Sequence, residues 1–476
     1  MVDALHQCKH YLRQVFIQTS LLTLCLGTSF SAKADVILHA FNWSYESIGD
    51  QAEEIASLGY RYVMPATPAK SVGGLWWARY QPQDYRVIDH PLGNKQSFEY
   101  MINELKKHGV EVIADIVLNH MANESFTRSD LNYPGLSVLS DYIDDEEYYE
   151  ANRLYGDLSQ NFLSALDFNP FGCIGDYLDP FQAQHGRICG GNGDVGLPDI
   201  SPNAWVIKQQ QDYVKALKEL GVTGFRIDAA KHMTLDHIRA VFTPEVKGDS
   251  FVFGEVITYG GSDTLEYQYF LEPYLRGTDH LAYDFPLLDL LKKAFTPSGR
   301  LDSVVNAYYR GQSLESSRAI LVATTHDVAN SYFDRFLMTP EDEDLANAYI
   351  LGKGQSKVMI YSETDDPGRP RWKDLHKRES IANMISFHNK MKGENAEYLY
   401  ASKCVLVVSR GNKGIMALNK CSGDTFIEAS VQGKFAEGTE LERNIDANET
   451  TTIQNGNIRI ELPARSVQYW VRSSDI

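Results

Sequence analysis

Residues 221–232 read GVTGFRIDAAKH, an apolar run that ends in charged side chains. The preceding run, Val206–Leu220, has the apolar spacing of a helix and stops before Gly221. Gly224–Ile227 then has the composition of a buried strand. Helix, short turn, strand and polar cluster in this order are typical of a parallel sheet whose helices cover its outer surface.

The same order repeats along residues 35 to about 390. The strand-like runs are Val36–Phe41, Arg61–Met64, Val110–Leu118, Gly224–Ile227, Phe251–Glu255, Leu281–Phe285, Ile320–Ala323 and Lys357–Tyr361. Helical runs between them include Gln51–Leu58, Phe98–Lys107, Val206–Leu220, Pro286–Phe295 and Ser380–Lys390. Eight alternating units favour an α/β fold with a closed parallel (β/α)8 TIM barrel. Periodicity hardly separates this barrel from a doubly wound open sheet, which stays the alternative.

Two regions depart from the alternating pattern. Residues from Asn119 to about Ser201 contain no clear barrel unit and many Gly, Asp, Asn and Tyr, so we expect an inserted subdomain over 120–201, after the third strand. The catalytic barrel would then comprise 35–119 and 202–394. Residues 395–476 consist of short β-like runs with turns such as Asn455-Gly456, which predicts a C-terminal antiparallel β-sandwich.

The N-terminus has the pattern of a secretory signal peptide. Basic residues at positions 9 and 13 precede an apolar stretch, Val15–Phe30, and Ala32-Lys33-Ala34 follows as a cleavage site. We therefore expect residues 1–34 to be removed and the protein to be secreted, to the medium or the periplasm. Lipid attachment at Cys25 is the alternative, which the bulky Leu24 disfavours. We expect the mature chain to have no membrane partner and to be a monomer.

Composition limits the classes of partner. The chain has 476 residues, of which 43% are hydrophobic and 23% charged, as in globular proteins. Its formal net charge is −18. An acidic surface repels phosphate backbones, so we expect no nucleic-acid partner, whereas a neutral polymer is compatible with this charge.

Four cysteines remain after the expected cleavage, at positions 173, 189, 404 and 421. They form two local pairs, and an oxidising compartment favours disulfides. We expect the bonds Cys173–Cys189 and Cys404–Cys421. Four buried free thiols are the alternative.

Four polar clusters fall at the carboxyl ends of expected barrel strands. They are DIVLNH at 115–120, GFRIDAAKH at 224–232, FGE at 253–255 and TTHD at 324–327. This end of a barrel is where its enzymes place catalytic groups. Carboxylates that are brought together there repel one another and lose hydration, which raises their pKa values, so the cluster indicates acid–base chemistry rather than a structural role.

In this order, the four clusters resemble the four signature regions of the α-amylase family. GLPDI at 196–200 resembles the family's additional motif near the end of the inserted domain. The resemblance covers nearly all of the mature chain. It implies a retaining glycoside hydrolase that cleaves α-1,4-glucosidic bonds inside starch, glycogen or maltodextrin chains. An α-glucanotransferase or an exo-acting maltooligosaccharide-forming amylase is the alternative; a non-catalytic carbohydrate-binding barrel should lack one of the family's three carboxylates.

The resemblance assigns roles to the carboxylates. It implies that Asp228 is the nucleophile, Glu255 the general acid/base and Asp327 the third carboxylate, which stabilises the transition state. Arg226 lies two residues before Asp228, so both side chains face the same way on a strand, and we expect Arg226 to keep Asp228 ionised. In the same motifs, His120 and His326 match histidines that hydrogen-bond the sugar at subsite −1.

A second informative stretch is WWARYQP at 76–82, which resembles a segment of animal-type α-amylases. Aromatic faces suit the apolar C–H surfaces of sugar rings, although packing under the rim is the structural alternative. The resemblance implies that Tyr80 stacks at subsite −1 and that Trp76, Trp77 and Gln81 line the donor side. It places Lys231 and His232 on the acceptor side.

The resemblance also implies a structural calcium ion, because calcium prefers several oxygen ligands. The matching ligands are the side chains of Asn119 and Asp199 and the backbone carbonyl of His232. Asp194 or another residue of 176–194 would complete the set.

Chloride is not expected. Animal-type relatives bind it through the arginine of the second motif, an asparagine two residues before the aspartate of the fourth motif, and a basic residue after the last strand. The second position here is Thr325 and the third is Glu363. A carboxylate repels an anion, so both departures argue against a chloride site.

We therefore predict that chloride added to dialysed protein leaves the rate of starch hydrolysis unchanged. The initial rate of reducing-end release, measured at equal ionic strength with chloride or acetate, checks this. A large gain that is specific to chloride would contradict the prediction.

Overall fold

The computed structural model describes residues 35–191, 193–330, 332–364, 370–444 and 449–473. The expected signal peptide, residues 1–34, lies outside the described residues. In the part of the chain that is described, no helix has both the length and the apolar character that crossing a membrane requires.

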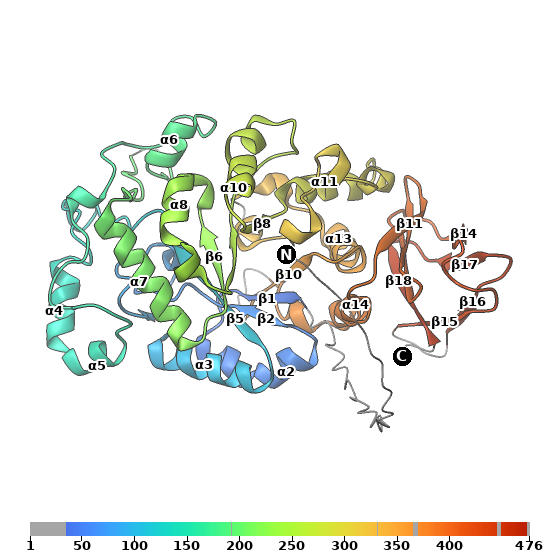
Figure 1. Ribbon diagram of the computed structural model, residues 1–476, viewed down its shortest axis with the longest axis horizontal. Helices are drawn as coiled ribbons and strands as arrows, with labels where there is room; N and C mark the ends of the chain where they lie inside the picture. The colour runs from blue at the N-terminus through green and yellow to red at the C-terminus, as the bar shows by residue number, and fades with distance from the viewer. Residues whose placement is uncertain (1–34, 192, 331, 365–369, 445–448, 474–476) are drawn as a thin grey trace, which may run out of the picture. The chain divides into compact units, whose positions relative to one another are not determined.

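Eight parallel strands close into a barrel in the order β1-β10-β9-β8-β7-β6-β5-β2 (Figure 1). They are β1 (Val36–Ala40), β2 (Tyr62–Met64), β5 (Glu111–Val117), β6 (Gly224–Asp228), β7 (Phe251–Gly254), β8 (Leu281–Tyr283), β9 (Ala319–Leu321) and β10 (Lys357–Ser362). Strand β1 pairs with both β2 and β10, so the sheet has no open edge. The predicted TIM barrel is thus confirmed, and the open sheet is excluded.

Helices follow the strands, and the longer ones surround the barrel (Figure 1). They are α1 (Tyr45–Asp50), α2 (Ala52–Ser57), α3 (Lys95–Lys107), α7 (Ala204–Leu220), α8 (Leu235–Val241), α9 (Pro244–Lys247), α10 (Glu272–Gly277), α11 (Phe285–Phe295), α12 (His326–Ala329), α13 (Pro340–Gly352) and α14 (Glu379–Lys390). The helix expected at Gln51–Leu58 is preceded by α1, which the sequence analysis missed. The N-cap of α1, Ser44, accepts a hydrogen bond from Ser47 N at 3.1 Å.

Two strands, β7 and β8, end earlier than expected, because the residues that follow them make other contacts. The run Leu281–Phe285 was expected as one strand, but β8 ends at Tyr283. Asp284 instead caps α11, and its carboxylate accepts a hydrogen bond from Leu287 N at 2.9 Å. Strand β7 ends at Gly254, so Glu255 lies just beyond the strand rather than within it.

One glycine is required for close packing between strands. A Cβ atom on Gly224 would lie 2.8 Å from the Phe251 ring of the neighbouring strand β7. Glycine at this position therefore lets the aromatic ring cover the start of β6.

The insertion between β5 and α7 begins and ends at the same rim of the barrel. A β-bridge joins His120, directly after β5, to Asp199, near the end of the insertion. The insertion contains α4 (Leu136–Asp144), α5 (Glu146–Ala151) and α6 (Pro180–His185), and the short ribbon β3 (Asp89–His90) and β4 (Gly93–Asn94) precedes α3. The disulfide Cys173–Cys189, with an S–S distance of 2.06 Å, closes a loop within the insertion.

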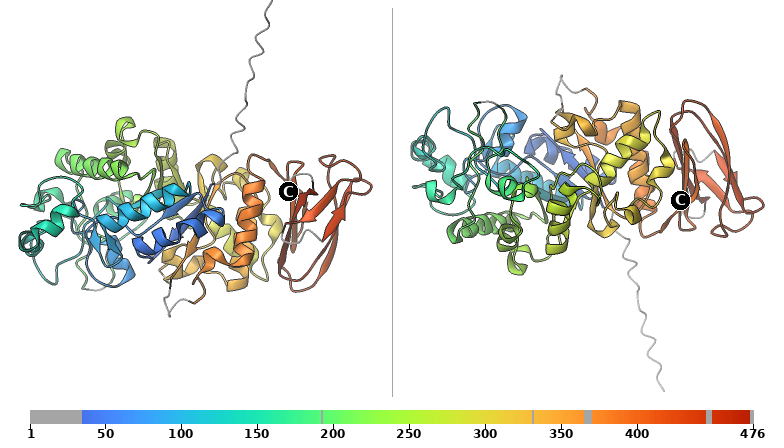
Figure 2. Two further views of the ribbon diagram at one scale, coloured as in Figure 1. Left: turned by 90° about the horizontal axis from the view of Figure 1, so that it is seen from below. Right: turned by 90° about the horizontal axis from the view of Figure 1, so that it is seen from above.

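The C-terminal part is antiparallel. A six-stranded sheet has the order β11-β12-β13-β18-β15-β16, and β14 pairs with β17. The strands are β11 (Ala396–Ala401), β12 (Val405–Arg410), β13 (Gly414–Asn419), β14 (Thr425–Ser430), β15 (Glu440–Arg443), β16 (Thr450–Thr452), β17 (Asn457–Leu462) and β18 (Ser466–Arg472). Figure 2 shows them in red next to the orange helices α13 and α14. The predicted antiparallel C-terminal structure is confirmed.

Alternate side chains of strand β12 pack into two different hydrophobic cores, one on each face of this sheet. Leu406 and Val408 join the core shared with the barrel, whereas Val405 and Val407 join a second core that includes Ile427 and other residues of β14 and β17. The alternation follows from the two-residue period of a strand. The second disulfide, Cys404–Cys421, lies next to these strands, so both expected pairings are present. The domain boundaries expected from the sequence remain a prediction.

Candidate active site

A buried arginine gathers carboxylates from three neighbouring strands. Arg226 and Asp228 are two residues apart on β6, so both side chains point to the same side. The guanidinium group of Arg226 lies 2.7 Å from carboxylate oxygens of Asp115 on β5, Asp228, and Glu255 after β7. The strand register explains the first contact, because Asp115 and Arg226 are paired across β5 and β6. The structure thus brings together two of the three predicted catalytic carboxylates.

Asp327 completes the group of acids. It follows His326 at the start of α12, and its Oδ2 lies 3.4 Å from His326 Nε2. Burial and the neighbouring Glu255 raise the pKa of Asp327 well above its ordinary value. Four carboxyl groups therefore surround one arginine.

Arg226 was expected to keep Asp228 ionised, but in the free site burial outweighs the effect of Arg226. Burial raises the pKa of Asp228 to about 8, although Arg226 lowers it; Glu255 and Asp115 raise it further. Asp228 keeps a raised pKa because it is buried and because the single charge of Arg226 is shared with Asp115 and Glu255. The free cluster consequently holds protons near neutral pH.

Glu255 is fixed by the backbone after β6. Its Oε2 accepts a hydrogen bond from Ala229 N at 3.2 Å. Ala229 has a φ of 49°, a left-handed conformation that non-glycine residues rarely adopt. The backbone carbonyl of Glu255 also accepts a hydrogen bond, from Lys231 N at 3.1 Å. A strained residue directly after Asp228 thus aims one N–H at the predicted acid/base.

The aromatic stretch predicted to bind sugar forms the short 3-10 helix η1 (Trp76–Tyr80). The Tyr80 ring stacks on His326, with centroids 4.9 Å apart and an interplanar angle of 9°, and its hydroxyl donates to Asp115 at 3.0 Å. Trp76 meets His326 edge-on at 5.8 Å. Trp77 is 40% exposed. Tyr80, Trp76 and His326 therefore adjoin the carboxylates, whereas Trp77 lies on the surface.

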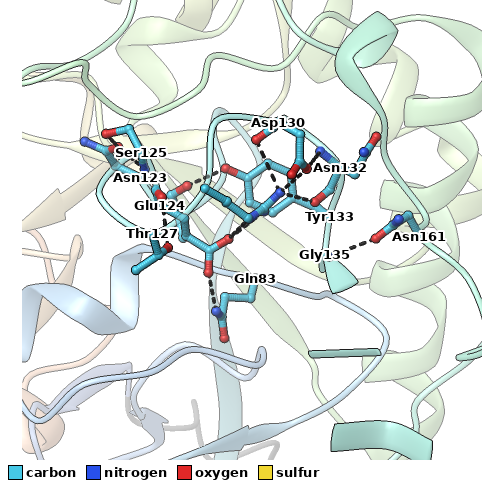
Figure 3. Close-up of polar contacts among 12 residues, drawn as sticks. Gln83, Asn123, Glu124, Ser125, Thr127, Asp130, Asn132, Tyr133, Gly135 and Asn161 are labelled. Atoms are coloured by element: carbon cyan, nitrogen blue, oxygen red, sulfur yellow. Dashed lines mark hydrogen bonds and ion pairs between the residues drawn. The ribbon is translucent and has the colours of Figure 1, made fainter. Parts of the chain in front are cut away.

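The inserted segment supports this aromatic turn. His120 Nε2 lies 2.9 Å from the backbone oxygen of Tyr80, and Gln81 Oε1 accepts a hydrogen bond from Asn123 N at 3.0 Å. The next residues extend the contact: Gln83 donates to Glu124, which is also hydrogen-bonded to Arg128 (Figure 3). His120 and Gln81 thus hold η1 against the insertion in this structure.

Lys231 and His232 connect the end of β6 to two helical segments. Lys231 Nζ lies 2.7 Å from Glu266 Oε1, and Glu266 Oε2 accepts a hydrogen bond from Tyr259 N at 2.8 Å. His232 Nδ1 lies 2.8 Å from the backbone oxygen of Ala183 in α6. Lys231 is therefore bonded to the helical segment that follows β7, and His232 to the insertion.

Two of the expected calcium ligands, Asn119 and Asp199, lie together where the insertion joins the barrel. Asn119 and Asp199 are both buried, and Asp199 Oδ2 accepts a hydrogen bond from Asn169 Nδ2 at 2.6 Å. Burial raises the pKa of Asp199 to about 7, with partial opposition from Asn169, Arg187 and Asn119. A buried carboxylate beside amide groups suits a hard cation, which would offset its desolvation.

Within the described residues, no three or more His, Cys, Asp or Glu side chains group as a metal site. A calcium ion here would therefore depend on one carboxylate together with amide and backbone oxygens. Asp194 already accepts hydrogen bonds from Asn123 Nδ2 at 2.7 Å, Gly190 N at 2.6 Å and Gly196 N at 3.0 Å. Asp194 therefore holds the turn between Gly190 and Gly196 and connects it to Asn123, so both of its carboxylate oxygens already have hydrogen-bond partners.

The two positions that depart from the chloride pattern have structural partners. Thr325 caps α12 and accepts a hydrogen bond from Val328 N at 3.4 Å. Glu363 is fully buried after β10, and its carboxylate accepts hydrogen bonds from the Tyr361 hydroxyl and from Asn42 Nδ2. A buried carboxylate stands where the pattern has a basic residue.

Three neighbours of the site received no role from the sequence. Asp115 was part of the first motif, and its contact with Arg226 could have been inferred from strand pairing. His39 points inward from β1, 5.3 Å from the His326 ring, and burial together with Arg226 lowers its pKa to about 3. Glu266 lies at the start of a helical segment that carries no motif, so no sequence signal identified its bond to Lys231.

The raised pKa of Asp228 predicts a pH-dependent gain in stability from Asp228→Asn. An unfolded chain loses the Asp228 proton near its ordinary pKa of 3.8, whereas the folded protein holds it to about pH 8. The parent therefore loses stability as pH rises across this range, and asparagine removes that loss. We expect the Tm advantage of the variant to be larger at pH 9 than at pH 5, by at least about 2 °C.

Thermal unfolding by circular dichroism at both pH values measures this difference. Asp236→Asn is the matched control, because the Asp236 side chain on α8 is 97% exposed. An equal Tm advantage at both pH values, or an Asp228→Asn variant with a lower Tm than the parent at pH 9, would contradict the raised pKa of Asp228.

Three comparisons place the chain among known proteins. Residues 53–157 match the family model "Alpha amylase, catalytic domain". The chain is 44% identical over 446 residues to an α-amylase from Aeromonas hydrophila, covering 91% of this chain and 95% of that protein. It is 25% identical over 464 residues to an α-amylase from Clostridium acetobutylicum, covering 92% of this chain and 54% of that protein.

Among solved structures, wild-type α-amylase I from Eisenia fetida superposes with a TM-score of 0.71 at 20% identity, covering 92% of this chain and 97% of that one. A cyclomaltodextrin glucanotransferase, CldA, superposes with a TM-score of 0.67 at 17% identity, covering 92% of this chain and 100% of that one. These structural likenesses show the fold. The identity and coverage of the Aeromonas relative show more: this chain belongs to the α-amylase family of glycoside hydrolases.

Proposed function

We propose that this protein is an endo-acting α-amylase that hydrolyses α-1,4-glucosidic bonds of starch, glycogen and maltodextrins with retention of anomeric configuration. The observation that carries the proposal is the contact of Asp228 and Glu255 with the same guanidinium group, each at 2.7 Å. A shared planar group favours the closer carboxyl spacing of retaining enzymes, about 5–5.5 Å, over the about 6.5–9.5 Å of inverting enzymes.

The two carboxyl groups divide the chemistry. Glu255, in its protonated form, donates its proton to the glycosidic oxygen while ionised Asp228 attacks the anomeric carbon and the glycosidic bond breaks. Glu255, now ionised, takes a proton from water, whose oxygen attacks the same carbon and displaces Asp228. Two inversions give net retention, and the enzyme returns to its starting protonation state.

Arg226 stabilises the ionised form of Asp228 on which the first step depends. In the free site, this stabilisation is outweighed by burial and by the neighbouring acids. A substrate that brings positive charge to the anomeric carbon in the transition state favours the ionised form, because the developing cation lies beside the carboxylate. Asp327 contributes to the same stabilisation and binds sugar hydroxyls.

The surrounding residues would bind the sugar units. In this proposal, Tyr80 stacks on the sugar at subsite −1, and His120 and His326 hydrogen-bond its hydroxyls. Trp76, Trp77 and Gln81 line the donor side. Lys231, held by Glu266, and His232 bind on the acceptor side.

A transglycosylating or exo-acting enzyme is the alternative function. The carboxylates are the same in both cases, and the relative CldA is named as a glucanotransferase. The identity of 44% with a protein named α-amylase favours hydrolysis. A time course of products from soluble starch separates the functions: random shortening indicates endo-hydrolysis, products longer than the substrate indicate transfer, and one short product from the outset indicates exo-action.

Calcium would serve as a structural cross-link at the junction of barrel and insertion. Asn119 and Asp199 would supply side-chain oxygens, and His232 its backbone carbonyl. The ion would join the end of β5, the end of β6 and the insertion, and thereby fix His120 next to Tyr80. The remaining features of the proposal are secretion after cleavage following Ala34, a monomeric state, and no membrane or nucleic-acid partner.

Substitution of either central carboxyl group should abolish most activity. We expect Glu255→Gln to lower kcat on soluble starch by about 10²–10⁴-fold, because the leaving oxygen loses its proton donor. Asp228→Asn should lower kcat at least as strongly, because the covalent step is lost. Reducing-end assays on protein with a native circular-dichroism spectrum measure both.

Glu343→Gln is the matched control for these variants. Glu343 is a buried carboxylate on α13 that pairs with Arg371 at 2.6 Å, outside the site. Its substitution should change stability but leave kcat near that of the parent. Near-full activity of a folded Asp228→Asn or Glu255→Gln protein would overturn the assignment.

Removal of calcium should destabilise the protein through Asp199. We expect excess chelator to lower the Tm of the parent and calcium to restore it, because the ion offsets the buried charge. Asp199→Asn should lower the Tm and remove the response to chelator. Asp194→Asn, the control, should keep the response, because Asp194 is used in its own loop. A parent Tm that chelator does not change would argue against a structural calcium ion.

A further inference from the structure

The outer surface carries a second concave site, away from the acidic cluster. It has a volume of about 420 Å³ and lies between α7 and residues 155–162 of the insertion. Trp205, Lys208, Gln209 and Asp212 line one wall at the spacing of a single helix face. The opposite wall is formed by the insertion. None of the residues that line this cavity belongs to the catalytic group described above.

The wall on α7 presents an aromatic ring in a fixed position. Trp205 is 50% exposed, although its backbone N–H is bonded to the helix cap Asn203 at 2.9 Å. Its indole Nε1 donates a hydrogen bond to the backbone oxygen of Phe162 across the cavity edge. The ring is therefore anchored at its polar edge while half of the residue's surface stays accessible. An anchored ring loses little entropy when a ligand stacks on it.

A second aromatic group is held in the same way. The Tyr155 hydroxyl donates a hydrogen bond to the backbone oxygen of Gln209 at 3.0 Å. This bond, with that of Trp205, joins α7 to both ends of the 155–162 segment. The cavity is therefore pre-formed, and both of its walls belong to the folded structure.

The charged side chains that line the cavity have polar or oppositely charged partners nearby. Arg86 pairs with Asp84 at 2.8 Å, and Lys208 pairs with Asp212 one helical turn away. Asp157 accepts hydrogen bonds from Ser159 N at 2.8 Å and Gln160 Nε2 at 3.3 Å. Such a cavity offers no net charge to an ion. Amide and carboxylate groups beside an aromatic face suit a neutral ligand that is rich in hydroxyl groups.

We infer that this cavity, lined by Trp205 and Tyr155, is a second binding site for α-glucan, separate from the site of hydrolysis. The inference rests on the proposed function, which supplies a neutral carbohydrate polymer as the substrate. A polymer held at Trp205 is present at high effective concentration near the catalytic group, so binding to long or insoluble glucan gains from both sites. A short soluble substrate that fills the catalytic site gains nothing from the second one.

Adsorption to starch granules tests this inference. The full mature chain carries Glu255→Gln to prevent digestion, and the fraction bound is measured against granule concentration. We expect Trp205→Ala to weaken adsorption by roughly 5- to 10-fold, because the stacking surface is lost. Gln160→Ala, at an exposed position that preserves the aromatic anchors, should weaken it more modestly.

Phe126→Ala is the matched control, because Phe126 is an aromatic residue of the same insertion that is 86% exposed and does not line the cavity. It should adsorb like its parent. In the background with an intact Glu255, Trp205→Ala should keep the kcat/KM of the parent on maltoheptaose, which excludes damage to the catalytic site.

The inference is overturned if Trp205→Ala and Gln160→Ala adsorb like the parent, or if Phe126→Ala loses as much adsorption as Trp205→Ala. It is also overturned if Trp205→Ala loses adsorption and maltoheptaose activity in equal proportion, since Trp205 would then act through the fold. Failure of the proposed function has a different signature: the parent with intact Glu255 would not hydrolyse maltoheptaose at all.

Discussion

The site depends on one buried cation. Burying a guanidinium group is costly unless charged partners surround it, and the barrel supplies those partners from neighbouring strands. The register of β5 and β6 puts Asp115 beside Arg226. Asp228 is the last residue of β6, and Glu255 directly follows the neighbouring strand β7. A shift of one residue in any of these strands would turn its polar side chain away from the group. The closed barrel therefore fixes the relative positions of the acids before any substrate binds.

The insertion adds what the barrel strands cannot provide. It leaves the rim after β5 and returns through the bridge between His120 and Asp199, so the residues that hold η1 and the proposed calcium ligands share one junction. The ring of Tyr80 is fixed from two sides, by the His326 ring and by the backbone contact of His120. The substrate-binding surface is thus coupled to the stability of the junction. Calcium binding there would strengthen the packing of Tyr80 without taking part in the reaction.

The alternating strands and helices and the main acids could be predicted from the sequence, because strand composition, helical spacing and motif order can be read along the chain. Closure of the sheet could not be decided by periodicity, because it depends on the pairing of β1 with β10. The contact of Arg226 with three acids could not be predicted, since it depends on which strands are neighbours and on their register. For the same reason, the expected charge state of Asp228 was wrong for the free site. The bond between Lys231 and Glu266 crosses 35 residues without a motif. The two hydrogen bonds that join the walls of the Trp205 cavity span 43 and 54 residues, and only the folded chain brings these segments together.

The central claim is that Asp228 and Glu255 act as a retaining pair. Proton NMR of the first products released from maltoheptaose, recorded before mutarotation, reports the configuration of the new reducing ends. The account predicts that the α-anomer appears first and then equilibrates toward the mixture with the β-anomer. Initial release of the β-anomer would show inversion, and would contradict the assignment of Asp228 as a nucleophile.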